Sequence, residues 1–129
     1  MLRNVHIKNM ALIDEIEDDI IEIDDEVSTE YEITSILKKH PTDTIVFTNV
    51  KDSDMNIISG ICNTRDKIAK SINTTVDKIT ENIINATNNP TAITNIKEVG
   101  DVYENSEDAN LSKIPVLKHY PNDKGKYIT

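Results

Sequence analysis

The chain has 129 residues, the length of one domain, and its net charge of −9 at pH 7 makes it strongly acidic. An acidic surface repels phosphate backbones, which argues against a nucleic-acid-binding protein. A single cysteine excludes an internal disulfide, and no apolar run approaches a membrane span or the core of a signal peptide. We therefore expect a soluble, cytoplasmic domain without a membrane partner.

The first part of the chain combines an amphipathic start with a strongly acidic run. Apolar residues at roughly helical spacing predict a helix over residues 1–13. Residues 14–32 then hold 11 of the 23 acidic residues. A calcium-binding loop needs a glycine at its sharp turn, and this run contains none. We interpret the run as a solvated acidic face rather than a metal site, with a short strand within it at residues 20–24.

A helix start follows the acidic run. Thr29, followed three residues later by Glu32, has the pattern of a capping box. Pro41 ends the predicted helix. The side chains predicted to form its buried stripe are Tyr31, Ile33, Ile36 and Leu37.

Two strands and a second helix are predicted next. Residues 44–50 are rich in β-branched side chains and form the clearest strand pattern in the chain. A polar loop leads to a second strand at residues 57–61. Asn63 or Thr64 can then cap a helix that runs through Ile72.

Three residues near this second helix start are candidates for chemistry. Gly60 could let the backbone cradle a phosphate, but the second glycine and the lysine of a P-loop are missing. Cys62 could be an activated thiolate, although no histidine lies near it in sequence. Arg65 could bind an anion, or it could pack its stem and pair with a carboxylate. The structural alternatives are a plain strand-to-helix turn, a small buried thiol and a surface ion pair, and we expect these.

A third helix is predicted over residues 74–88, ending before Pro90. Its apolar residues recur at i, i+3, i+7 and i+8, which predicts a buried stripe made of Val76, Ile79, Ile83 and Ile84. A strand is predicted at residues 93–99, and a short element at residues 102–103 precedes an acidic loop.

The last sixteen residues, 114–129, form what we call the closing segment. Pro115 favours extended chain, residues 121–125 have turn chemistry, and residues 126–129 predict the beginning of a strand. A strand needs about five residues and a partner, so we expect this chain to be the front part of a larger protein. His119 precedes Asp123 by four residues, which permits an acid–base dyad or, as we expect, a structural hydrogen bond.

The closing segment resembles the Pro-x-x-x-His-x-x-x-Asp-x-Gly-x-Tyr-Ile-Thr motif of the UbiD-type decarboxylases. The matching residues are Pro115, His119, Asp123, Gly125, Tyr127, Ile128 and Thr129. Residues 46–72 are also similar to that family in their order of strand, polar loop, strand and Arg-bearing helix. The runs CNTRDKIAK and GKYIT look most like archaeal members, which are associated with anhydromevalonate phosphate decarboxylation in isoprenoid synthesis. The 3-polyprenyl-4-hydroxybenzoate decarboxylases are the nearest alternative.

The resemblance implies an α/β fold, with a small mixed β-sheet and three to four packed helices. Residues 1–113 would form the N-terminal domain, and residues 114–129 the linker and first strand leading into a flavin-binding domain. The implied enzyme removes carbon dioxide non-oxidatively from an unsaturated acid, using prenylated FMN, a divalent metal such as manganese, and potassium.

In that family the catalytic Glu–Arg–Glu network lies downstream of the motif. The resemblance therefore implies that this chain alone holds no catalytic or metal residue and is inactive, with Thr129 as its one cofactor contact. The implied partners are the downstream flavin-binding and C-terminal domains, and further copies in a homo-oligomer. Two alternatives from other classes are a stand-alone acidic interaction module without enzymatic activity and a small metal-binding protein.

Overall fold

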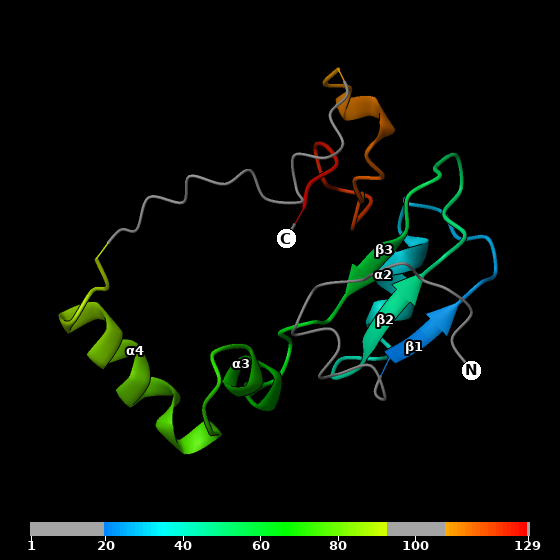
Figure 1. The fold of residues 1–129 in the computed structure, drawn as a ribbon. Coiled ribbons are helices and arrows are strands. Elements are labelled where there is room, and N and C mark those ends of the chain that lie inside the picture. Colours follow the sequence, from blue (N-terminus) through cyan, green and yellow to red (C-terminus); the bar gives the residue numbers. More distant parts are fainter. Residues whose placement is uncertain (1–19, 93–107, 129) are drawn as a thin grey trace.

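The computed structural model describes residues 20–92 and 108–128. Their centre is a three-stranded sheet of order β1-β2-β3, in which β1 is Ile20–Ile23, β2 is Thr44–Phe47 and β3 is Ile57–Ser59 (Figure 1). The sheet is mixed, because β1 pairs with β2 in parallel and β2 pairs with β3 antiparallel. The expected α/β class with a small mixed sheet is confirmed.

The helix between β1 and β2 explains their parallel pairing, since parallel neighbours need a crossover connection. This helix, α2, spans Glu32–Leu37. Its Ile33 packs into a core cluster with Ile45 and Phe47 of β2, and all three side chains are fully buried. Every residue of β2 is buried, as expected for a central strand covered on both faces.

The predicted capping box at the start of α2 is wrong. The carboxylate of Glu32 accepts the backbone N–H of Ser28, and the helix begins at Glu32 rather than directly after Thr29. Tyr31 precedes the helix with a φ of 67°, in the left-handed region that a tyrosine rarely adopts. The N–H of Tyr31 donates to the carbonyl oxygen of Lys118. This partner, distant in the sequence, holds the backbone at Tyr31 outside the helix, which then starts at Glu32.

The second helix, α3, spans Arg65–Ser71, close to its prediction. Thr64 caps it, because its side-chain oxygen accepts the N–H of Lys67. A 3₁₀ turn at Val76–Lys78 then leads into α4, Ile79–Asn88. We call α3, this turn and α4 the helical arm.

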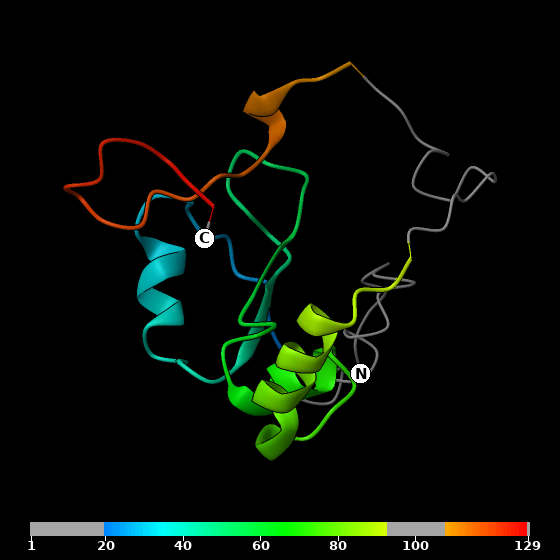
Figure 2. The ribbon, with the colours of Figure 1, turned by 90° about the vertical axis from the view of Figure 1, so that its left-hand side faces the viewer.

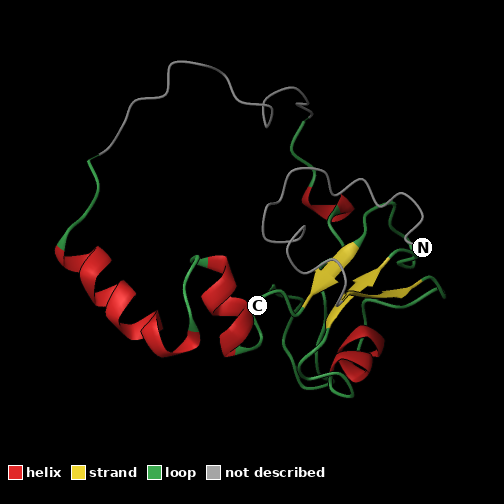
Figure 3. Ribbon diagram, turned by 60° about the horizontal axis from the view of Figure 1, so that its bottom comes forward, coloured by secondary structure: helices red, strands yellow, loops and turns green. Residues whose placement is uncertain are grey.

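The helical arm lies to one side of the sheet in Figures 1 and 3, and Figure 2 views the molecule from the side of this arm. Its predicted buried stripe is therefore only partly correct. Ile79 is buried, but Ile83 and Ile84 are 53% and 56% exposed, because no described element covers that face of α4. The periodicity predicted the helix correctly and its environment incorrectly.

A 3₁₀ turn at Leu111–Lys113 precedes the closing segment. No strand forms among the described residues 126–128, where one was predicted to begin. The predicted helix at residues 1–13, strand at 93–99 and element at 102–103 lie outside the described residues, as does Thr129. No helix among the described residues is long and apolar enough to cross a membrane.

Candidate functional site

The closing segment is attached to the chain just before α2. The N–H of Tyr31 donates to the Lys118 carbonyl at 2.9 Å, and the N–H of Lys118 donates to the Thr29 carbonyl at 3.0 Å. These two bonds form an isolated parallel bridge between Glu30 and Lys118. The stretches around Glu30 and Lys118, far apart in the sequence, thus behave locally as paired strands.

His119 extends this attachment with its side chain. Its Nδ1 lies 2.9 Å from the hydroxyl of Thr34 on α2, and its Nε2 lies 3.2 Å from the carbonyl oxygen of Tyr127. Its ring also stacks at a tilt on that of Tyr127, with centroids 4.7 Å apart. His119 thus makes hydrogen bonds with Thr34 and Tyr127, and not the one with Asp123 that its spacing in the sequence suggested.

Asp123 does not pair with His119, so the dyad that the spacing permitted does not form. Its carboxylate accepts the backbone N–H of Tyr120 at 2.7 Å, and its own N–H donates to the Tyr120 carbonyl at 3.1 Å. This closes the predicted turn. Partial burial, and secondarily the nearby Asp123 carboxylate, raise the pKa of Tyr127 above its ordinary value.

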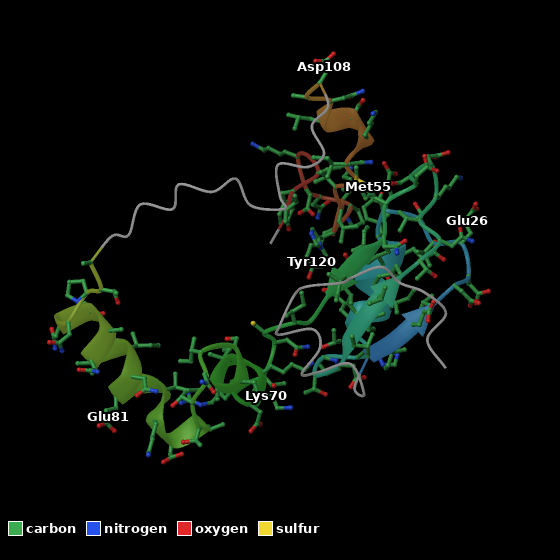
Figure 4. All side chains as sticks on the ribbon, in the orientation of Figure 1. Glu26, Met55, Lys70, Glu81, Asp108 and Tyr120 are labelled. Carbon is green, nitrogen blue, oxygen red and sulfur yellow. The ribbon has the colours of Figure 1, made fainter. Side chains whose placement is uncertain are left out.

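A groove of about 430 Å³ lies between the closing segment and the β3 side of the sheet. One wall comes from the end of α2, from β3 and from the loop before β3, the other from the closing segment. Figure 4 shows Met55 and Tyr120 in this part of the molecule, far from Lys70 and Glu81 of the helical arm. The lining side chains are mostly apolar: Leu37, Met55, Asn56, Ile57, Ile58, Ser59, Ile114, Pro115, Leu117, His119, Tyr127 and Ile128.

Several side chains of this groove are more exposed than a folded domain on its own would favour. Ile128 is 77% exposed, and Met55, Ile114 and Tyr127 are each 41% exposed. A contiguous apolar surface of this kind is typical of a site that contacts another protein surface or a ligand.

Comparison with known proteins identifies the family. The model of the 3-octaprenyl-4-hydroxybenzoate carboxy-lyase N-terminal domain, the UbiD N-terminal domain, matches residues 13–87, more than half of the chain. The chain belongs to the UbiD N-terminal domain family. The predicted membership of this family is thereby confirmed; the matched range includes residues 46–72 and ends before the closing segment.

The anhydromevalonate phosphate decarboxylase of Methanothermobacter thermautotrophicus is 45% identical to this chain over 117 residues, which are 91% of the chain and 27% of that protein. Two structures of the UbiD-class enzyme HmfF from Pelotomaculum thermopropionicum share the fold, each with a TM-score of 0.82 at 23% identity. One is in complex with FMN, and the other is an evolved dimeric form in complex with prFMN. They match over 92% of this chain and 28% and 29% of their own. The chain thus spans little more than a quarter of the length of these relatives.

The strand-to-helix junction of this UbiD N-terminal domain holds an unforeseen residue, Lys67. This lysine is buried, and its ammonium group donates to the Thr42 carbonyl at 2.6 Å, the Gly60 carbonyl at 3.0 Å and Oδ1 of Asn63 at 2.9 Å. All three acceptors are neutral. Lysine is rarely buried, so nothing in the sequence marked this position.

Gly60, Cys62 and Arg65, the three candidates for chemistry, also lie at this junction. Gly60 has a φ of 80°, and a Cβ at this position would collide with the Asp43 carbonyl oxygen, so the turn itself requires glycine. The ammonium of Lys67 already donates to three oxygens, so it is not available to bind an anion at Gly60. Cys62 is exposed rather than buried as expected, and Arg65 is exposed as well.

The described residues differ from a metal site and the groove differs from a flavin site. They contain no group of three or more His, Cys, Asp or Glu side chains that could hold a metal ion. The groove is lined mainly by apolar side chains and carries no arginine or lysine to bind a phosphate. This groove therefore does not fit prenylated FMN, and we derive no catalytic step from it.

Proposed function

We propose that this chain is the N-terminal, non-catalytic part of a UbiD-class decarboxylase that acts on anhydromevalonate phosphate. The observation that carries the proposal is the 45% identity to an enzyme of that name, extending over 91% of the chain. The reaction is the non-oxidative removal of carbon dioxide from an unsaturated acid. It would supply an isoprenoid precursor.

The cofactor, on this proposal, is prenylated FMN, held with a divalent metal such as manganese and with potassium by residues of the downstream domains. The flavins in the two HmfF structures support this assignment. Thr129 is proposed as the one residue of this chain beside the flavin, because it matches the last position of the family motif. The boundary between residues 113 and 114 is proposed as the start of the linker into the flavin-binding domain.

The groove gives this domain its role in the enzyme. We propose that the downstream part of the polypeptide packs there, because its apolar lining is continuous with the closing segment, which in the family leads into the flavin-binding domain. The full enzyme is proposed to be a cytoplasmic homo-oligomer, in line with the single free cysteine Cys62.

A decarboxylation assay tests this function. The chain is compared with a version extended by its downstream gene sequence, both supplied with prenylated FMN and manganese. We expect turnover of anhydromevalonate phosphate by the extended version and none by the chain of 129 residues. A 3-polyprenyl-4-hydroxybenzoate substrate serves as the control, because the family model carries the name of that activity.

Three outcomes would contradict the proposal in different ways. Turnover by the short chain would show that catalysis resides in this domain. Turnover of only the aromatic acid by the extended version would keep the family and replace the substrate. If no extension exists in the gene, the chain is a stand-alone module.

A further inference from the structure

His119 links α2 with the beginning and the end of a loop in the closing segment. Its Nδ1 contacts the hydroxyl of Thr34 on α2, and its Nε2 contacts the carbonyl of Tyr127 near the end of the closing segment. The intervening chain is a loop whose ends are joined by the N–H of Tyr127, which donates to the Leu117 carbonyl at 2.9 Å. His119 therefore lies at the neck of a closed loop and ties that neck to α2.

We propose that His119 is a positioning residue that fixes the direction in which the chain leaves this domain after Tyr127. Its imidazole acts as a latch of defined tautomer, with the proton on Nε2. The consequence for the enzyme rests on the proposed function, since Thr129, two residues beyond Tyr127, is the proposed flavin contact. The latch itself rests only on the geometry of this domain.

The tautomer follows from the partners. A carbonyl oxygen only accepts hydrogen bonds, so Nε2 must carry a proton to bond to Tyr127. In the neutral imidazole Nδ1 is then an acceptor, and the Thr34 hydroxyl is its donor. Thr34 is only 8% exposed, which leaves little access for water to replace the imidazole as its partner.

The latch acts on the peptide plane after Tyr127. Without His119, the backbone hydrogen bond between Tyr127 and Leu117 would still join the loop ends, and the Lys126 ammonium would still lie 3.4 Å from the Thr29 hydroxyl. Neither of these contacts involves the Tyr127 carbonyl, so that group would lose its partner among the described residues, and the ring stacking on the tyrosine would also be lost. Tyr127 and Ile128 line the groove, so a rotation of this peptide plane would change the surface offered to the downstream domain.

Two substitutions separate the two hydrogen bonds. In His119→Gln the side-chain amide nitrogen reaches about as far from the backbone as Nε2, so it can still donate to Tyr127. In His119→Asn the amide reaches only as far as Nδ1 and serves Thr34 alone. Thr34→Val removes the hydroxyl at nearly constant shape and serves as the third variant.

Amide hydrogen exchange of this chain, read by NMR, provides the test. We expect His119→Asn to speed exchange at the Tyr127 amide at least tenfold and His119→Gln to change it less than threefold. The Phe47 amide in β2 should stay the same in both, and Thr34→Val should fall between them. A long-range proton–nitrogen spectrum of the unsubstituted chain should show the Nε2–H tautomer.

Three results would overturn the latch. The first is an Nδ1–H tautomer, and the second is equal exchange at Tyr127 in the Gln and Asn variants. The third is a parallel loss of protection at Phe47, which would make His119 a general stabiliser. In the extended enzyme, His119→Asn should weaken flavin binding at least fivefold and His119→Gln should not. If no version of the extended enzyme binds flavin, the proposed function fails, while the exchange result still decides the latch.

Discussion

Two regions of the molecule can be compared: the sheet together with α2, and the helical arm. Both have apolar residues at regular spacing in the sequence, but the environments of those residues differ. In the first region, Ile33, Ile45 and Phe47 are fully buried. In the second, the isoleucines at helical spacing on α4 include two that are more than half exposed. Apolar periodicity therefore predicts which face of an element is apolar, but a partner surface decides whether that face is buried.

The largest expected loss of stability comes from a substitution in the core of the sheet. Phe47→Ala removes a fully buried aromatic side chain and should lower the free energy of unfolding by about 3–5 kcal/mol. Urea denaturation followed by circular dichroism would measure the loss. A change below about 1 kcal/mol would mean that β2 is not the centre of the core.

The next effect concerns the junction between the two regions. Lys67→Met leaves three oxygens without their charged donor and should cost about 2–3 kcal/mol. The matched control is Lys70→Met on the same helix, where an exposed lysine should change stability by less than about 0.5 kcal/mol. Equal effects of the two substitutions in denaturation experiments would refute the role assigned to the buried ammonium.

A much smaller effect is expected on α4. Ile83→Ser combined with Ile84→Ser should change the free energy of unfolding of this chain by less than about 1 kcal/mol, because both side chains are mostly exposed. The measurement is the same urea titration. A loss similar to that of Phe47→Ala would show that the helical arm packs against another surface in solution, and would remove the contrast between the regions.

The smallest effect is a pH dependence in the helical arm. A hydrogen bond from the Thr75 side chain lowers the pKa of Asp77 below the ordinary 3.8. A carboxyl with a lowered folded pKa adds stability that is present above its unfolded pKa and is lost as the pH falls through its folded value. Acid below about pH 4 should therefore loosen the start of α4.

An NMR titration of the Asp77 carboxyl carbon would measure this pKa directly. The midpoint should lie below 3.8 in the unsubstituted chain and move upward in Thr75→Ala. An unchanged midpoint in Thr75→Ala would show that this hydrogen bond does not lower the pKa of Asp77.

The sequence by itself predicted much of the fold because many of its signals are local. β-branched runs, the Thr64 cap and the glycine turn at Gly60 act within a few residues of their own position, and the structure has all of them close to where they were expected. The motif in the closing segment was likewise sufficient to indicate the family.

Tertiary structure decided the points that depend on distant partners. The predicted capping box at Thr29 does not form, and Tyr31 donates a hydrogen bond to Lys118 there instead. His119 bonds to Thr34 and Tyr127 rather than to Asp123. Lys67 is buried because three neutral oxygens converge on its ammonium, one from Thr42 before β2 and two from Gly60 and Asn63 in the junction after β3. Apart from Asn63, which lies four residues before Lys67, these partners have no spacing that a sequence pattern could reveal, because the contacts depend on where the fold places backbone groups in space.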